Sequence, residues 1–510
     1  MPLLRSPDTA HLQVGAVSVT PSQAGAPCVV RQWETRAGCH AHVRTRAAHA
    51  STARLRSFAT GGTAMPKSRQ DINELSAGQL NDYIHAVDIL RARSAADPDD
   101  PAGYDFQAAL HNDVFVGPCE HGSDLFLPWH RAHLHYFEKL LQGTDPPRTA
   151  NVTVPYWDWI HAQPTGKFPA AFDRPGLSSP GRNLSPTPLP PDTLEIVTTE
   201  TDPGKFGGFP EAHPGGDYGR LELGPHNYMH PDFIGGLMAD PGTAAQDPIY
   251  FSFHCFIDLF WAEWQRRNGS PPPTSPDHDL RGFLDQPKHK VADFRDALDL
   301  DYAYEYSEQL DTAFGVPVPP PSPPRELVMT KPLEAVSEAG FTMELREKAR
   351  VQFRLAPPPD LGRWVVVRLD ELKVPVTGSY TLRGFVHPAD VEFRRDDEAF
   401  ARSYGVGYVS MWRAHHGSHG GGHGGGHGTP HGPHGGHGHH GGHEPPAHHP
   451  TSCTARFDVT AVLASTPTAA GEHVLTLQYV PSPAPTGEAR EPAGLVAEVA
   501  LKDVLMEVYG

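Results

Sequence analysis

The chain is organised around the stretch LHNDVFVGPCEHGSDLFLPWHRAHLHYFEKLL, residues 110–141. It carries three spaced histidines, His111, His121 and His130. Apolar residues recur at helical spacing over residues 126–141, which places His130 in the first turn of a helix. His121 lies nine residues earlier in a loop rich in Gly and Ser, so it can swing in beside His130.

Two further stretches downstream carry the other three histidines. LELGPHNYMHPDFIGG, residues 221–236, carries His226 and His230, whose i, i+4 spacing puts them on one face of a helix. DPIYFSFHCFIDLFWAEWQ, residues 247–265, predicts a further helix that carries His254. Six histidines in two sets of three indicate two metal ions, each held by three neutral imidazoles. Imidazole suits copper, zinc, iron and nickel, so the spacing alone does not select the metal.

Four motifs in this region resemble the type-3 copper proteins, a family that includes tyrosinases, catechol oxidases and molluscan haemocyanins. They are HGSDLFLPWHR at 121–131, PYWDW at 155–159, PHNYMH at 225–230, and the DPxxxxxHxxxD pattern that begins at 247 and runs on to WAEW. The resemblance covers about residues 80–268. It implies an antiparallel four-helix bundle with a dicopper site in its core, where such bundles often hold metals.

The resemblance also implies the ligands. His111, His121 and His130 would bind the first copper (Cu A), and His226, His230 and His254 the second (Cu B). His85 is interpreted as a surface or packing histidine. His133 and His135, of which at most one can face the site, are interpreted as histidines that pack behind the ligands or support them. The chain departs from the family in its last motif, where Phe253 stands in place of a second histidine and Leu259 in place of a basic residue.

Three further residues match functional positions of the family. Cys119 has the Cys-x-His spacing to His121 that carries a thioether in fungal relatives; the alternative is a buried thiol. Glu222 and Asn227 match residues that together orient a water able to take a phenol's proton. The alternatives are a solvated charge at a helix entry for Glu222 and a turn residue for Asn227.

Composition limits the possible partners and compartments. The chain has 510 residues and a net charge of −18, which argues against binding to nucleic acid. No apolar run approaches the length of a membrane span. Five scattered cysteines do not make a disulfide framework, and residues 1–64 lack the apolar core of a secretory signal. The compartment stays open, with the cytoplasm favoured.

The domain organisation is read from changes in composition, and the predicted class is α + β. Residues 1–64 form either a disordered extension, with some transit-peptide character, or a mis-called start upstream of Met65. A helical catalytic domain spans 65–315, and a Pro-rich linker follows at 316–325. Residues 326–510 alternate as strands and predict a β-sandwich or small barrel.

Two features of the C-terminal part bear on function. Its RFDV sequence at 456–459 resembles an element of plant-type polyphenol oxidases, in which this domain covers the copper site and keeps the enzyme latent. A tract at 415–449 places thirteen histidines among glycines without apolar residues, which predicts disorder. It is either a copper-collecting tether or a loop insertion between two strands.

The resemblance implies a dicopper oxidase that uses O2 to convert phenols and o-diphenols to o-quinones, latent until the C-terminal domain is displaced. Small phenols and O2 are the expected substrates. One alternative within the family is an o-aminophenol oxidase, for which the Phe253-His254-Cys255 departure makes a narrow substrate range plausible. Two alternatives from other classes are an oxygen carrier and a copper-storage protein that uses the His-rich tract.

Overall fold

The computed structural model describes residues 66–111, 118–161, 168–183, 193–210, 218–315, 326–336, 342–344, 350–357, 364–373, 379–395, 397–412, 452–466, 472–482 and 498–510. The predicted extension 1–64, the linker 316–325 and the His-rich tract 415–449 lie outside the described residues, so these assignments stay predictions. None of the described helices is long and apolar enough to cross a membrane.

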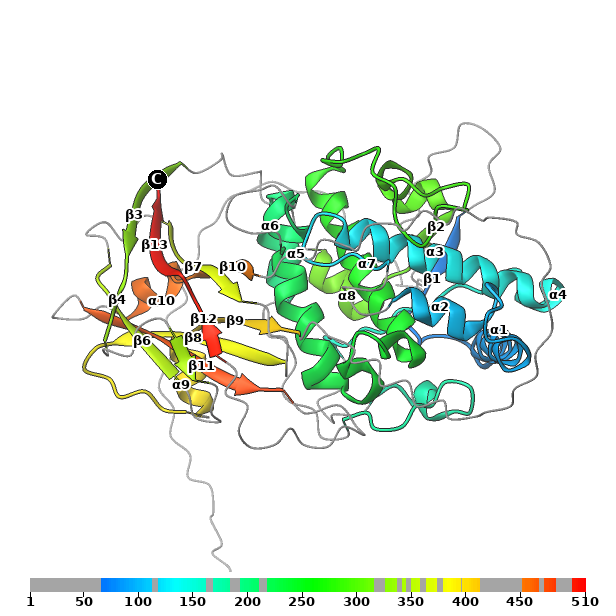
Figure 1. Ribbon diagram of the computed structural model, residues 1–510, viewed down its shortest axis with the longest axis horizontal. Coiled ribbons are helices and arrows are strands. Elements are labelled where there is room, and N and C mark those ends of the chain that lie inside the picture. The colour runs from blue at the N-terminus through cyan, green and yellow to red at the C-terminus, as the bar shows by residue number, and fades with distance from the viewer. Residues whose placement is uncertain are drawn as a thin grey trace, which may run out of the picture. The chain divides into compact units, whose positions relative to one another are not determined.

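The first half of the described chain is helical (Figure 1). Three long helices are central to it: α1 (Ala77–Ala96), α3 (Phe126–Thr144) and α7 (Ile249–Asn268). α3 packs against both α1 and α7. α7 is buried around most of its surface, as expected of a central helix, while α1 begins at a capping box between Ser76 and Gln79.

Shorter elements complete this half. They are α2 (Tyr104–Leu110), α4 (Pro146–Thr149), η1 (Ala170–Asp173), α5 (Thr193–Thr199), α6 (Pro203–Gly207), η4 (Gly236–Ala239), η5 (Ala244–Gln246), η6 (Val291–Phe294), η7 (Ala297–Leu300) and α8 (Glu308–Phe314), with a parallel strand pair β1 (Lys67–Arg69) and β2 (Tyr302–Tyr304).

The fourth long helical segment, residues 220–234, is distorted. It contains two π-type stretches, η2 (Glu222–His226) and η3 (Met229–Ile234). Gly224 leaves helical geometry, with φ −89° and ψ −106°, and Pro225 follows it inside the helix. Proline removes a backbone donor and clashes with the preceding turn, so a break here is expected. The segment therefore depends on its neighbours for its shape.

The second half is a β-sandwich, which confirms the predicted α + β class. One sheet has the order β10-β7-β13-β3 and the other β4-β6-β11-β8-β9, and neighbouring strands in both are antiparallel. Alternating residues of both sheets, such as Val367 on β7 and Leu475 on β11, share one buried core.

The elements of this half are β3 (Leu327–Pro332), β4 (Glu334–Ala335), β5 (Thr342–Glu344), β6 (Arg350–Leu355), β7 (Trp364–Lys373), β8 (Tyr380–Pro388), α9 (Glu398–Tyr404), β9 (Gly405–Met411), β10 (Ser452–Asp458), α10 (Thr460–Ser465), β11 (His473–Pro481), β12 (Glu498–Ala500) and β13 (Asp503–Tyr509). The described residues, all between 66 and 510, form one compact unit, within which β9 packs against η2.

Candidate metal centre

Six histidines from five different segments meet in the helical half. His111 caps the end of α2, His121 lies in the loop before α3, and His130 is on α3. His226 and His230 lie on the distorted segment 220–234, and His254 on α7. All six are buried, with exposed fractions of 5% or less. These are the six histidines that the sequence motifs single out.

The ligand atoms of these histidines lie close enough to share metal ions. Those of His226, His230 and His254 all lie within 4.8 Å of one another, as the second predicted set requires. The first set does not form one such group: His111 groups with His121 and Cys119, while His130 groups with histidines of both sets. The rings of His130 and His254 stack at 4.8 Å between centroids, so α3 and α7 bring the two sets together.

Every one of the six rings is anchored through Nδ1. Four Nδ1 atoms face backbone carbonyls and two face side-chain oxygens, at 2.7–3.1 Å: Pro241 O for His111, Glu222 Oε1 for His121, Phe126 O for His130, Asn227 Oδ1 for His226, Met238 O for His230 and Tyr250 O for His254. An oxygen acceptor requires the proton on Nδ1, which leaves Nε2 as a lone-pair donor. Such an outer hydrogen bond is usual for a histidine that binds a metal.

Burial keeps five of these six rings neutral. It lowers the pKa of His111 to about 4 and that of His226 to about 3. It also lowers the pKa of His130, His230 and His254 well below the ordinary value, and neighbouring histidines add to this effect. Neutral imidazole is the form that binds metal ions.

The inner nitrogens need a cation. Nε2 of His121 lies 3.4 Å from Nε2 of His111, and Nε2 of His226 lies 3.1 Å from Nε2 of His254. With the protons on Nδ1, each of these pairs sets two lone pairs against each other. Nε2 of His130 and of His230 are buried with no hydrogen-bond partner among the described residues, a costly state without a ligand. The residues therefore fit a pair of imidazole-bound metal ions.

Glu222 and Asn227 lie at this centre, each against a different histidine. The Glu222 carboxylate accepts from Nδ1 of His121 at 2.9 Å and from the backbone N–H of Gly122 at 3.0 Å. Burial raises the pKa of Glu222 well above its ordinary value. The alternative interpretation of Glu222 as a solvated charge is wrong, because the side chain is fully buried. Both residues hold the outer nitrogen of a histidine.

The other predicted residues are placed as follows. Cys119 is buried, and its sulfur lies within 4.8 Å of a ligand atom of His121 and of His111. His133 is buried between the Tyr250 hydroxyl and the Gln107 carbonyl. His135 is buried against Tyr136 and Phe294. His85 is partly exposed and pairs with Asp145.

Trp412, at the end of β9, is a residue of the centre that the motifs did not indicate. Its indole stacks on the His230 ring at 4.0 Å between centroids and 24° between planes. Its Nε1–H donates to the Ala239 carbonyl at 3.0 Å. The sequence signal was a tryptophan beside a His-rich tract, which does not reveal a contact with a histidine far away in the chain.

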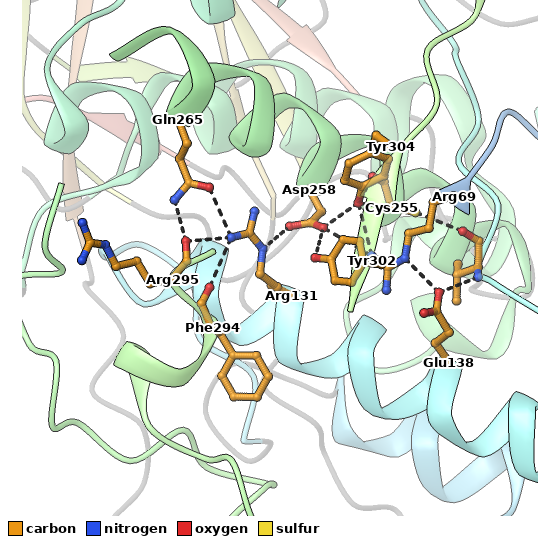
Figure 2. Close-up of polar contacts among 11 residues, drawn as sticks. Arg69, Arg131, Glu138, Cys255, Asp258, Gln265, Phe294, Arg295, Tyr302 and Tyr304 are labelled. Carbon is orange, nitrogen blue, oxygen red and sulfur yellow. Dashed lines mark hydrogen bonds and ion pairs between the residues drawn. The ribbon is translucent and has the colours of Figure 1, made fainter. Parts of the chain in front are cut away.

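A buried charge network behind the histidines was also missed (Figure 2). Asp258 on α7 accepts from Arg131 Nε at 2.6 Å, from Arg69 Nη1 at 3.3 Å, and from the hydroxyls of Tyr302 and Tyr304 at 2.6 and 2.5 Å. Arg131 directly follows His130 on α3, and Asp258 lies one turn after His254 on α7. Burial alone would raise the pKa of Asp258, but these cations and hydroxyls outweigh it and hold the pKa below its ordinary value.

We expect Asp258→Asn to lower the free energy of unfolding by about 3–5 kcal/mol, because it leaves Arg69 and Arg131 buried without their shared charge. Chemical denaturation of the apo chain measures the change. Because the pKa of Asp258 is lowered in the folded chain, its charge stabilises the fold above the ordinary carboxyl range, and this stabilisation is lost as pH falls below about 4. The variant lacks this charge, so it is expected to lose less stability on acidification than the wild type. The control Asp82→Asn breaks an exposed pair with Arg148 and is expected to cost less than about 1 kcal/mol. Equal small losses in both variants would contradict this role.

The comparisons agree with this centre. The family model described as the common central domain of tyrosinase matches residues 101–211 and 187–267. A tyrosinase of Hahella sp. is 31% identical over 261 residues, which are 41% of this chain and 55% of that protein. A tyrosinase of Streptomyces antibioticus is 32% identical over 215 residues, which are 33% of this chain and 75% of that protein. The chain thus spans about half the length of the first relative and three quarters of the second.

The solved structures show that the fold extends beyond the helical half. A latent aurone synthase, described as a polyphenol oxidase, superposes with a TM-score of 0.59 at 17% sequence identity. The superposition covers 89% of this chain and 92% of the aurone synthase chain. That coverage includes both the helical half and the β-sandwich. The family of these relatives implies a dinuclear copper centre, for which the six histidines have the right chemistry. The chain therefore belongs to the tyrosinase family of type-3 copper proteins.

Proposed function

We propose that this protein uses O2 to oxidise phenols and o-diphenols to o-quinones, with two copper ions held by the six histidines. His111, His121 and His130 would hold one copper, and His226, His230 and His254 the other. The observation that carries the proposal is the anchoring of all six Nδ1 atoms on oxygens, which leaves six neutral Nε2 atoms for metal. The copper pair would supply the redox chemistry, and the protein supplies geometry and a dry pocket.

Aromatic side chains pack against the histidine rings of this centre. Phe126 lies against His130 and His226 at 4.7 and 4.8 Å between centroids, and Phe253 against His230 and His254 at 5.2 and 4.8 Å. They keep water from the ligands and fix the planes of the rings. Phe253 also gives the second set an apolar wall where most relatives carry a histidine. This departure supports the second candidate, an o-aminophenol oxidase of narrow substrate range.

A screen of the copper-loaded chain on tyrosine, catechols and o-aminophenols tests the proposal. Oxidation of catechols, with or without tyrosine, is the expected result. Turnover of o-aminophenols with no catechol oxidation would favour the second candidate. Reversible O2 uptake without any turnover would instead indicate a carrier. Binding of many coppers that persists without the six histidines would indicate storage.

We also propose that the C-terminal β-sandwich keeps the enzyme latent. Trp412 supports this, because its ring, which follows strand β9 of the sandwich, stacks on the His230 ring and covers one side of the centre. The relatives whose fold matches over both halves include a protein described as latent. Displacement of the sandwich would remove the indole together with strand β9.

A thioether between Cys119 and His121 stays a proposal that rests on their Cys-x-His spacing and on their closeness in the structure. Peptide mass spectrometry of the copper-matured protein is expected to show the peptide that contains Cys119 and His121 with a mass two hydrogens lower than that of the unlinked peptide. The bond would restrict His121, which lies on a loop and has no helix to hold it. A Cys119 that is fully alkylated after copper maturation would count against the bond, and protein never exposed to copper is the matched control.

For hydroxylation of monophenols we propose that Glu222 and Asn227 hold a water that takes the phenol's proton. Free phenols titrate near pH 10, so a base has to act at neutral pH. Glu222→Gln is expected to depress monophenol oxidation by about 10²–10⁴-fold while diphenol oxidation falls much less. Steady-state rates on a matched phenol and catechol decide it. If both rates fall together, the two residues serve to position His121 and His226, as their described contacts also allow.

A further inference from the structure

The segment that carries the second set of histidines is held by the C-terminal sandwich. Residues 220–234 are interrupted at Gly224 and Pro225, just before His226, so regular helical geometry does not by itself set the position of this histidine. Strand β9 packs against η2 at this point. The sandwich therefore contributes to the shape of the site as well as covering it.

Asn227 connects His226 to strand β9. Its Nδ2 donates to the backbone carbonyl of Ser410 at 3.1 Å, and its Oδ1 accepts from Nδ1 of His226 at 2.9 Å. The first contact determines the second: with the NH2 group on the Ser410 carbonyl, the oxygen has to face His226. A rotated amide would set its NH2 against the N–H of His226. The strand thus fixes the group that orients this ring.

Three more residues of the C-terminal half, Trp412, Thr381 and Ser482, contact the same segment. Trp412, directly after β9, stacks on His230 and donates to Ala239, next to the Met238 carbonyl that anchors His230. The carboxylate of Asp232 accepts from Thr381 at 3.3 Å and from Ser482 at 3.0 Å. The Thr381 hydroxyl is also hydrogen-bonded to the Ser410 hydroxyl at 2.7 Å. These contacts therefore form one continuous interface between the sandwich and the helical half, called the seam below.

The first set of histidines has no such hydrogen bond to the sandwich among the described contacts of its outer nitrogens. These nitrogens face Pro241, Glu222 and Phe126, which all belong to the helical half. Displacement of the sandwich therefore removes a direct hydrogen-bonded support from the second set. It reaches the first set less directly, through Glu222 on η2, which anchors His121, and through Trp412, whose ring lies 6.0 Å from that of His111.

We propose that Asn227 and the Ser410 carbonyl couple docking of the C-terminal sandwich to metal binding by His226, His230 and His254, so that each strengthens the other. Coupling between two binding events is reciprocal: a sandwich that favours the metal-binding arrangement is itself held more firmly once the metal is bound. This inference rests on the proposed function only in that the second set binds a metal; it needs no oxidase turnover.

Hydrogen exchange of the full chain, with and without Cu(II), tests the coupling. In the wild type, copper is expected to slow exchange of the β9 amides by at least about fivefold, the lower end of typical coupling. In Asn227→Asp a carboxylate oxygen still accepts from His226, but the donor to Ser410 is gone. We expect this variant to bind copper at the second set and to lose most of the slowing at β9.

Lys205→Ala is the matched control. Lys205 on α6 lies over Trp364 and Tyr509, 5.1 and 5.8 Å from the ring centroids, so its loss loosens another part of the seam without touching a histidine. It is expected to speed exchange overall but to keep the effect of copper. Trp412→Leu removes the stack on His230 and is expected to reduce the slowing of β9 exchange by copper. This variant replaces Asn227→Asp in the test if Asn227→Asp does not fold.

The same slowing in Asn227→Asp as in the wild type would overturn the coupling, and so would copper binding by the six histidines of the wild type with no change at β9. A chain that shows the coupling but oxidises no phenol would refute the proposed function and leave this inference standing.

Discussion

Replacing His226 by alanine is expected to leave one copper per chain at the centre and to abolish phenol oxidation. His226 supplies one of three nitrogens to its copper, and its Nε2 lies 3.1 Å from that of His254. Loss of a residue that merely holds a ligand typically costs about 10–100-fold, so loss of the ligand itself is expected to cost more. Copper analysis and catechol oxidation on the same sample measure both effects.

His133→Gln provides the control for this variant. His133 is as deeply buried as the ligands, but its two nitrogens face the Tyr250 hydroxyl and the Gln107 carbonyl. Its replacement is expected to cost about 1–3 kcal/mol of stability through unmade hydrogen bonds and to leave both coppers in place. Full activity of the His226 variant, or loss of copper in both variants alike, would contradict the assignment.

Release of the C-terminal sandwich is expected to raise catechol oxidation about 10–1000-fold. This range corresponds to an open state populated at about 0.1–10% in the intact chain. Proteolysis within the predicted linker 316–325 is the change that releases the whole sandwich. Trp412→Ala removes only the ring over His230, so this substitution is expected to raise catechol oxidation less than proteolysis does. Initial rates before and after each change measure the effect.

Trp364→Phe is the control for the tryptophan substitution, because Trp364 lies on β7 and packs with Tyr509 rather than with a histidine. The phenylalanine ring keeps an aromatic face under Lys205 of α6, so this contact with the helical half is retained. It is expected to leave latency unchanged. Unchanged turnover after cleavage and in Trp412→Ala would show that the sandwich does not shield the site.

The helices and histidines were predictable because their signals are local. Segments that carry the histidines, such as 121–131 and 225–230, combine helical periodicity with fixed histidine spacing. The structure brings all six histidines together. Likewise, alternation between Gly and Pro boundaries predicted the strands of the sandwich, whose core is built from alternating residues. Both patterns act over one or two turns of a helix or along one strand.

Contacts between distant segments were not predictable in this way. Arg69 and Tyr302 belong to strands of three residues, too short to give a periodic signal, yet both contact Asp258. Trp412 was missed because nothing near it in the sequence indicates its contact with the distant His230. Glu222 and Asn227 were identified by position, but only the structure shows which atoms they contact, and these contacts add a positioning role to the predicted catalytic one.

Anomalous X-ray scattering at the copper edge, from a crystal of the copper-loaded chain, tests the central claim most directly. Two copper peaks are expected in the helical half, one within bonding distance of Nε2 of His111, His121 and His130, and the other within bonding distance of Nε2 of His226, His230 and His254. A single peak among the six histidines, or copper found only elsewhere in the chain, would contradict the account.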